Sequence, residues 1–101
     1  MSASLMEYIS STFPSGELLL RDTPETLLLP STGLLESMTL LRRDVKLHFD
    51  MCSDHNAVDW PEKEQLELFW LLHSTTLGHS LRVSCFLERQ GTQLPSMQNW
   101  I

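Results

Sequence analysis

The sequence predicts a single α+β domain, a two-layer sandwich with two helices on one face of a mixed sheet, in the order α-β-β-α-β-β-β. Two segments carry apolar residues at helical spacing, and the second half alternates apolar and polar residues as strands do. With 101 residues, of which 42% are hydrophobic, the chain can build one core. No internal repeat, low-complexity tract or linker divides it, so residues 1–101 are expected to form one domain.

The first helix is predicted near the N-terminus. Ser4 and Glu7 have the spacing of a capping box, in which each side chain bonds the other's free backbone N–H. The apolar residues that follow share one helical face: Leu5, Met6, Ile9 and Phe13. Pro14 and Gly16 then end the helix.

Two short strands and a second helix come next. Glu17–Arg21 and Thr26–Leu29 are leucine-rich runs separated by turn-forming residues, which favours strands. After Pro30, Ser31 is the predicted N-cap of a helix over about Thr32–Arg43. Five of its residues recur at steps of three and four: Leu34, Leu35, Met38, Leu41 and Arg42.

Three strands are predicted in the second half. His48–Asp59 begins with alternation and becomes polar at Ser53–Asn56, which indicates a strand interrupted by a bend. Trp60–Lys63 forms a turn. The next strand has a regular apolar face: Leu66, Leu68, Trp70 and Leu72. Phe69 and Leu71 are apolar on its other face, which predicts partial cover on both sides. Thr75–His79 forms the turn to a last strand with a second apolar face: Leu81, Val83, Cys85 and Leu87.

Charge and hydropathy narrow the functional class. The net charge of −6 argues against partners rich in phosphate, both nucleic acids and anionic lipids. The longest purely apolar run, Leu68–Leu72, is far too short to cross a bilayer, and the N-terminus lacks the features of a signal peptide. A cytoplasmic location is expected, and in that reducing compartment Cys52 and Cys85 are expected to be buried thiols and not a disulfide.

Catalytic motifs are absent from the sequence. The four glycines stand too far apart for a phosphate-binding loop, and neither a G-x-S-x-G nor a C-x-x-C motif occurs. His73 and His79 are expected to be ordinary strand-end and turn histidines, because no serine or carboxylate lies at a catalytic spacing. Trp60 and Trp100 either contact a partner or, in the case of Trp60, cover the core.

The densest polar cluster, Phe49–Asp59, has two interpretations. On an extended backbone Asp50, Cys52 and Asp54 would share one face and, together with His48 or His55, could hold a metal ion. In the simpler interpretation Asp54 and Asp59 cap turns, and Cys52 packs as a small apolar residue.

Several motifs resemble one family when taken in order. Leu47–Asp54 resembles its L-x-F-D-M-L-x-D run, and Ala57–Pro61 resembles its V-D-Y-P. Phe69–Ser74 resembles a family strand that ends in L-x-S. Leu81–Ser84 resembles a family strand in which arginine alternates with apolar residues, and Leu94–Met97 resembles a V-P-S-V tetrapeptide of the family. The family is that of the thirty-kilodalton subunit of bacterial NADH:quinone oxidoreductase, the NADH dehydrogenase of respiratory complex I. The resemblance spans Thr26 to Met97.

The resemblance implies a structural subunit with no catalytic residue and no cofactor of its own. Such a subunit would sit peripherally on the inner face of the cell membrane, without inserting into it, and would brace a large cofactor-bearing subunit and an iron–sulfur subunit. The residues expected at such interfaces are Asp50, Asp54, Asp59, Trp60, Pro95, Ser96 and Trp100. Nothing in the sequence identifies the electron donor or acceptor. A free-standing adaptor domain and a small metal-binding protein or enzyme remain alternatives.

One departure from the family pattern concerns the end of the chain. The family continues with an A-N-W-L-E-R-E run and a D-M-F-G motif, whereas this sequence ends at Trp100-Ile101. Residues 94–101 are therefore expected to be a tail that a partner orders or that is truncated. Naturally short relatives of this kind occur in energy-converting [NiFe] hydrogenases, so the resemblance extends to them.

Overall fold

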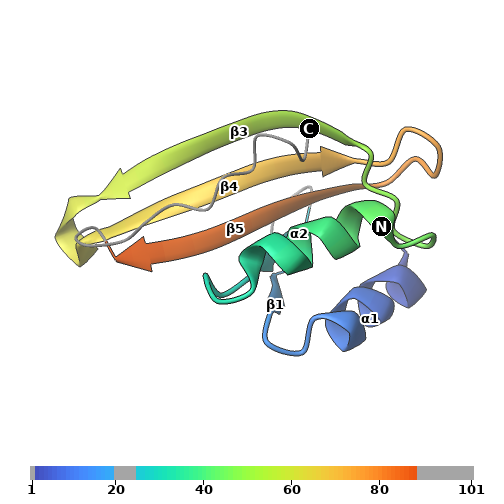
Figure 1. Cartoon of the computed structure of the whole chain (residues 1–101), viewed down its shortest axis with the longest axis horizontal. Helices are drawn as coiled ribbons and strands as arrows, with labels where there is room; N and C mark the ends of the chain where they lie inside the picture. The colour runs from blue at the N-terminus through green and yellow to red at the C-terminus, as the bar shows by residue number, and fades with distance from the viewer. Residues whose placement is uncertain (1, 20–24, 89–101) are drawn as a thin grey trace.

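The computed structural model describes residues 2–19 and 25–88 (Figure 1). Its elements are α1 (Ala3–Thr12), β1 (Glu17–Leu19), β2 (Thr26–Leu28), α2 (Leu34–Arg43), β3 (Met51–Trp60), the 3₁₀ turn η1 (Pro61–Lys63), β4 (Gln65–His73) and β5 (Ser80–Glu88). The predicted α+β class is confirmed, and the helices and strands follow one another in the predicted order.

The strands form one mixed sheet in the order β1-β2-β5-β4-β3. Strands β3, β4 and β5 make a long antiparallel meander. Strand β2 pairs with β5 in parallel, and α2, β3 and β4 lie between these two strands in the sequence. Within the described ranges the sheet has two edges of unequal length. The three-residue β1 forms one edge and the ten-residue β3 forms the other.

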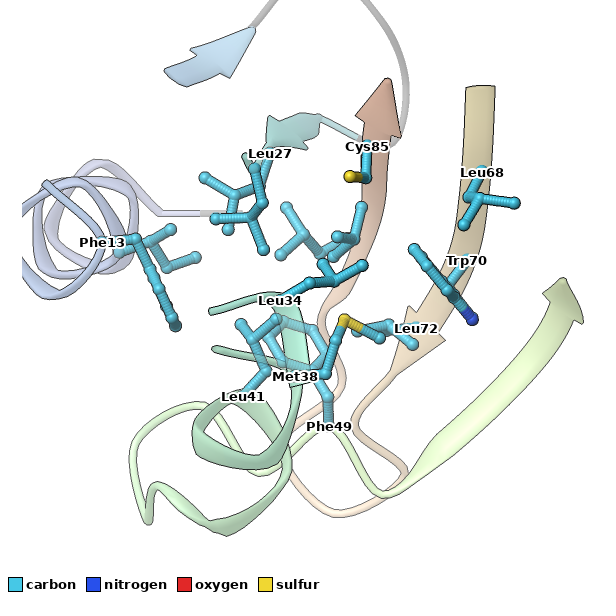
Figure 2. Packing of buried hydrophobic residues seen from close by; sticks show 14 of the residues in the cluster. Phe13, Leu27, Leu34, Met38, Leu41, Phe49, Leu68, Trp70, Leu72 and Cys85 are labelled. Carbon is cyan, nitrogen blue, oxygen red and sulfur yellow. The ribbon is translucent and has the colours of Figure 1, made fainter. Parts of the chain in front are cut away.

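The core lies between the two helices and one face of the sheet (Figure 2). The two helices contribute Ile9, Leu34, Met38 and Leu41, and the residue after α1 contributes Phe13, all 5% exposed or less. The sheet contributes the alternating residues that the sequence predicted: Leu68, Trp70, Leu72, Leu81, Val83, Cys85 and Leu87. We call this the helix-side face and the opposite one the open face. On the open face Phe69 and Leu71 are half-buried, which agrees with the partial cover predicted for β4.

Both predicted helix caps are wrong. Helix α1 begins earlier than expected, because Ser2 and not Ser4 accepts a hydrogen bond, from the N–H of Leu5 at 3.2 Å. Helix α2 begins at Leu34, whose N–H donates to the carbonyl of Ser31, so Ser31 opens a turn before the helix. Gly33 occupies the N-cap in the left-handed region, with φ of 73°, a conformation that glycine adopts without strain.

Strand β3 runs without a break through the polar segment that predicted a bend. The chain absorbs one extra residue as a β-bulge, because its pairing with β4 shifts register between Cys52 and Asp54. Cys52 pairs with Leu72 on the helix-side face, whereas Asp54 pairs with Leu71 on the open face. The bulge therefore reverses the alternation on which the grouping of Asp50, Cys52 and Asp54 depended.

The β4–β5 turn offers a simple test of backbone geometry at Gly78, which has φ of 76° and open space where a Cβ would lie. Gly78→Ala is therefore expected to lower the free energy of unfolding by about 1 kcal/mol through backbone strain alone. Gly78→Asn should lower it less, because asparagine tolerates this conformation better. Urea unfolding of the two variants measures the difference. Equal losses would contradict the assignment of strain to φ.

Candidate functional site

Asp50 ties the start of β3 to the β4–β5 turn. Its two carboxylate oxygens accept hydrogen bonds from the backbone N–H of Thr75 at 2.9 Å and from the Thr75 hydroxyl. The Thr75 hydroxyl and then its N–H favour the charged form, and they lower the pKa of Asp50 below its usual value. Among the predicted aspartates, it is Asp50 that performs the turn-stabilising role assigned to Asp54 and Asp59.

Asp50→Asn is expected to reduce the sensitivity of the fold to acid. Because the folded pKa is lowered, the carboxylate stabilises the fold fully above its unfolded pKa of about 4, and this contribution is lost as the pH falls through the folded pKa. Urea unfolding at about pH 7 and about pH 2.5 should show a larger loss of stability in the wild type than in the variant. The same loss in both proteins would show that Asp50 is not the group responsible.

Asp54 and Asp59 both lie in β3 and are exposed, so the prediction that they cap turns is wrong. The physical reason is that an edge strand exposed on both faces has no apolar alternation, and its polar run looks like a loop. These carboxylates are directed away from the core. They are placed where another molecule could contact them.

Cys52 does not join a cluster of metal ligands. The residue is half-buried on the helix-side face, and its thiol donates to the carbonyl of Asp54 at 3.2 Å. His48 Nε2 lies 3.9 Å from Asp50 Oδ2, but Asp54 is on the other face of the sheet. Over residues 2–19 and 25–88, no three histidine, cysteine, aspartate or glutamate side chains lie close enough to hold a metal ion. The geometry required by the metal hypothesis is not formed there.

The two cysteines are unbonded thiols, as predicted. Cys85 is buried in the core and Cys52 is half-buried. Burial raises the pKa of both thiols, so each stays protonated and poorly nucleophilic at neutral pH.

Trp60 lies on the open face at the far end of β3 and does not cover the helix-side core. Its side chain is 42% exposed, and its Nε1–H donates to Glu67 Oε1 at 3.2 Å. Glu67 also accepts from the hydroxyl of Ser84 at 3.0 Å and from Arg82 at 3.3 Å. Arg82 in turn lies over the Phe69 ring at 4.1 Å. These side chains form a polar network across β3, β4 and β5, which we call the open-face network.

Two histidines bond groups within the fold. His73 lies between two hydroxyls, with Nε2 2.6 Å from Ser53 Oγ and Nδ1 2.8 Å from Ser80 Oγ. His79 Nε2 lies 2.6 Å from the carbonyl oxygen of Leu47. Sequence reasoning missed Ser53 and Ser80, because only the strand register reveals that they flank His73.

His55 stacks on the buried ring of Trp70, with the two ring centroids 5.1 Å apart. Its ring therefore shields one of the largest core side chains from solvent at the edge strand. The remaining interface candidates, Pro95, Ser96 and Trp100, lie outside the described residues. Within the described ranges, none of the helices has the length and apolar character needed to cross a membrane.

The fold and the placement of its polar groups define a class of protein: a small α+β domain whose titratable side chains tie strands and turns together, with one long edge strand exposed. A family model described as respiratory-chain NADH dehydrogenase, 30 Kd subunit, matches residues 27–101. The chain belongs to this family, as the resemblance over Thr26 to Met97 predicted.

Two known proteins are similar to this chain, one in sequence and one in fold. A subunit of the NADH-quinone oxidoreductase of Moorella thermoacetica is 37% identical over 76 residues, which cover 75% of this chain and 49% of that protein. A chain in the structure of the membrane-bound sulfane sulfur reductase, an archaeal respiratory membrane complex, superposes with a TM-score of 0.73 over 86% of this chain and 50% of that one. At 20% identity this second likeness concerns the fold alone. The chain spans about half the length of these relatives.

Proposed function

We propose that this chain is a non-catalytic structural subunit of a complex I-like respiratory complex. It would brace a large cofactor-bearing subunit and an iron–sulfur subunit in the cytoplasmic arm, and attach to the membrane only through them. The observation that carries the proposal is the family match, which extends over β2, α2 and the whole β3–β5 meander. A related chain from Moorella thermoacetica is named as a subunit of an oxidoreductase.

The arrangement of polar side chains supports a structural role. Asp50 bonds Thr75, Glu67 bonds the open-face network, and His73 bonds two serines. In each case the side chain links two strands or a strand and a turn. Such bonds make the sheet rigid, which suits a brace between larger subunits. Electrons would then move through the partners.

Recovery of the intact complex tests this proposal. A tagged chain should be expressed in the organism that encodes it and isolated in mild detergent, with an untagged strain as control. The chain is expected to migrate on a native gel with a large cofactor-bearing subunit and an iron–sulfur subunit. If repeated mild isolations give only the free chain, near its own mass of 11.6 kDa, the proposal is wrong.

The metal-binding alternative gains no support from the site. Asp54 lies across the sheet from Cys52, and Asp50 is held by Thr75. A chelator is therefore expected to leave the melting temperature of the purified chain unchanged, because no structural metal would be removed. Calorimetry with and without chelator measures this. A fall in melting temperature that added zinc reverses would restore the metal hypothesis.

A further inference from the structure

Strand β3 is a long edge with only one neighbour in the described part of the chain. All its register partners lie on β4, from Met51 opposite His73 to Trp60 opposite Gln65. Most of its residues are exposed, and in Figure 1 the turn that joins β3 to β4 extends beyond the N-terminal end of α2. The opposite edge, β1, is only three residues long. A sheet edge of ten residues can template a further strand, and proteins normally protect such edges.

The hydrogen-bond pattern shows which groups face outward. The N–H of Ala57 donates to the side-chain Oδ1 of its neighbour Asn56 at 2.8 Å, and not to β4. In an antiparallel pair the backbone groups alternate between the two sides of a strand, so the N–H of His55 faces the same open side as that of Ala57. The side-chain oxygen of Asn56 thus accepts the hydrogen bond of a backbone N–H on the outer edge of β3. A backbone carbonyl of an added strand can take its place as the acceptor.

The charge along this edge identifies the kind of partner. Two carboxylates, Asp54 and Asp59, lie in β3 itself, and two more, Glu62 and Glu64, lie in and just after the turn η1 that follows it, against a single lysine, Lys63. All of these side chains are exposed. Two copies of the chain paired edge to edge would bring these like charges together, which disfavours a β3–β3 dimer. A strand that carries basic residues would instead be attracted by these negative charges.

The faces of β3 restrict the partner further. Asp54 lies on the open face and Asp59 on the helix-side face, so basic residues are needed on both faces of an added strand. Met51 and Trp60 lie near the two ends of β3 on the open face, 46% and 42% exposed. They offer apolar contacts at either end of the paired segment, and aromatic residues are often central to interfaces.

We propose that the open edge of β3 binds an extended, basic segment of a partner subunit by strand addition. This inference rests on the proposed function, because it assigns the surface through which the brace holds a neighbour. Backbone hydrogen bonds would supply affinity, and the carboxylates would select the basic segment.

Synthetic peptides test the surface directly on the full-length chain. The probe is a fluorescent ten-residue peptide in which pairs of valines alternate with pairs of lysines, so that lysine lies on both faces of the extended strand. Its binding is followed by anisotropy. Replacing lysine by glutamate, or methylating alternate backbone nitrogens on the pairing side, should weaken binding about tenfold or more, because each removes one of the two proposed interactions. If the methylated peptide binds as well as the parent, strand addition is excluded.

Matched variants of the chain locate the binding. Ala57→Pro removes an outward N–H without removing a bond to β4, and it should weaken binding about tenfold. Asp54→Asn should weaken binding severalfold, whereas Glu36→Gln, which removes the same charge from α2, should not. Circular dichroism checks that each variant is folded. If Ala57→Pro does not fold, the methylated peptide still decides whether strand addition occurs. Equal losses for Asp54→Asn and Glu36→Gln would mean only nonspecific attraction between opposite charges.

The two proposals fail separately. If Ala57→Pro is folded and the tagged variant still recovers the complete complex in normal yield, the β3 edge is not the docking surface while the subunit role survives. If the peptide binds as described but the native chain is recovered alone, strand addition stands and the subunit role fails. Sedimentation of the chain without peptide completes the set, because a dimer that Ala57→Pro abolishes would assign the edge to a second copy.

Discussion

Trp70→Ala is expected to lower the free energy of unfolding by about 3–5 kcal/mol. Trp70 is 1% exposed and lies at the centre of β4, on the face against which α2 packs (Figure 2). Removing the indole leaves a large cavity in the core cluster and takes away the surface on which His55 stacks. Urea unfolding followed by circular dichroism gives the change. The loss should be a large part of the total stability of so small a domain.

Two further variants show whether burial is the cause. Phe86→Ala removes a ring of similar size from the open face of β5, where Phe86 is 38% exposed, and should cost much less. Trp70→Phe keeps most of the apolar volume and removes the indole Nε1–H, which is buried without a hydrogen-bond partner among the described residues. It should therefore cost well under half as much as Trp70→Ala. Comparable losses at Trp70 and Phe86 would contradict the placement of the core.

Glu67→Ala is the second large effect, with an expected loss of about 2 kcal/mol. The side chain of Glu67 is only 12% exposed and accepts hydrogen bonds from Trp60, Ser84 and Arg82. Its removal leaves the buried hydroxyl of Ser84 and the half-buried guanidinium of Arg82 without this acceptor. Because Arg82 keeps 31% exposure and can be rehydrated, the loss should stay below that of a fully buried ion pair.

Glu62→Ala is the matched control for Glu67→Ala, since it removes the same charge from an exposed position in η1. It should change the free energy of unfolding by less than about 0.5 kcal/mol. A double-mutant cycle between Glu67→Ala and Arg82→Ala then isolates the coupling of the pair. If Glu67→Ala costs no more than Glu62→Ala, the open-face network does not stabilise the sheet.

The elements that sequence reasoning found are those whose pattern repeats. The face of α2 and the alternating faces of β4 and β5 are periodic because one side of each packs on the core. Strand β3 lacks such a pattern, since an edge strand exposed on both faces has no apolar alternation and its polar run resembled a bend. The bulge after Cys52 was also invisible, because one extra residue leaves no mark in composition.

The site was less predictable than the fold because its contacts join residues far apart in the sequence. Asp50 was named as a possible metal ligand and interface residue, and its role in holding the β4–β5 turn was not predicted, because its partner Thr75 is 25 positions away. The open-face network becomes apparent only once the register pairs Glu67 with its neighbours on β5. No local spacing encodes such a register.

The central claim is that this chain holds a complex together while the chemistry proceeds in other subunits. The most direct test is the turnover measured per assembled complex. A strain lacking the chain should be complemented with the wild type or with the triple variant Asp50→Asn, Cys52→Ser, Asp54→Asn. The oxidoreductase activity of each preparation is then divided by the amount of intact complex. A bracing role predicts equal activity per complex, with any deficit confined to the amount assembled. A fully assembled complex that the triple variant leaves inactive would contradict it.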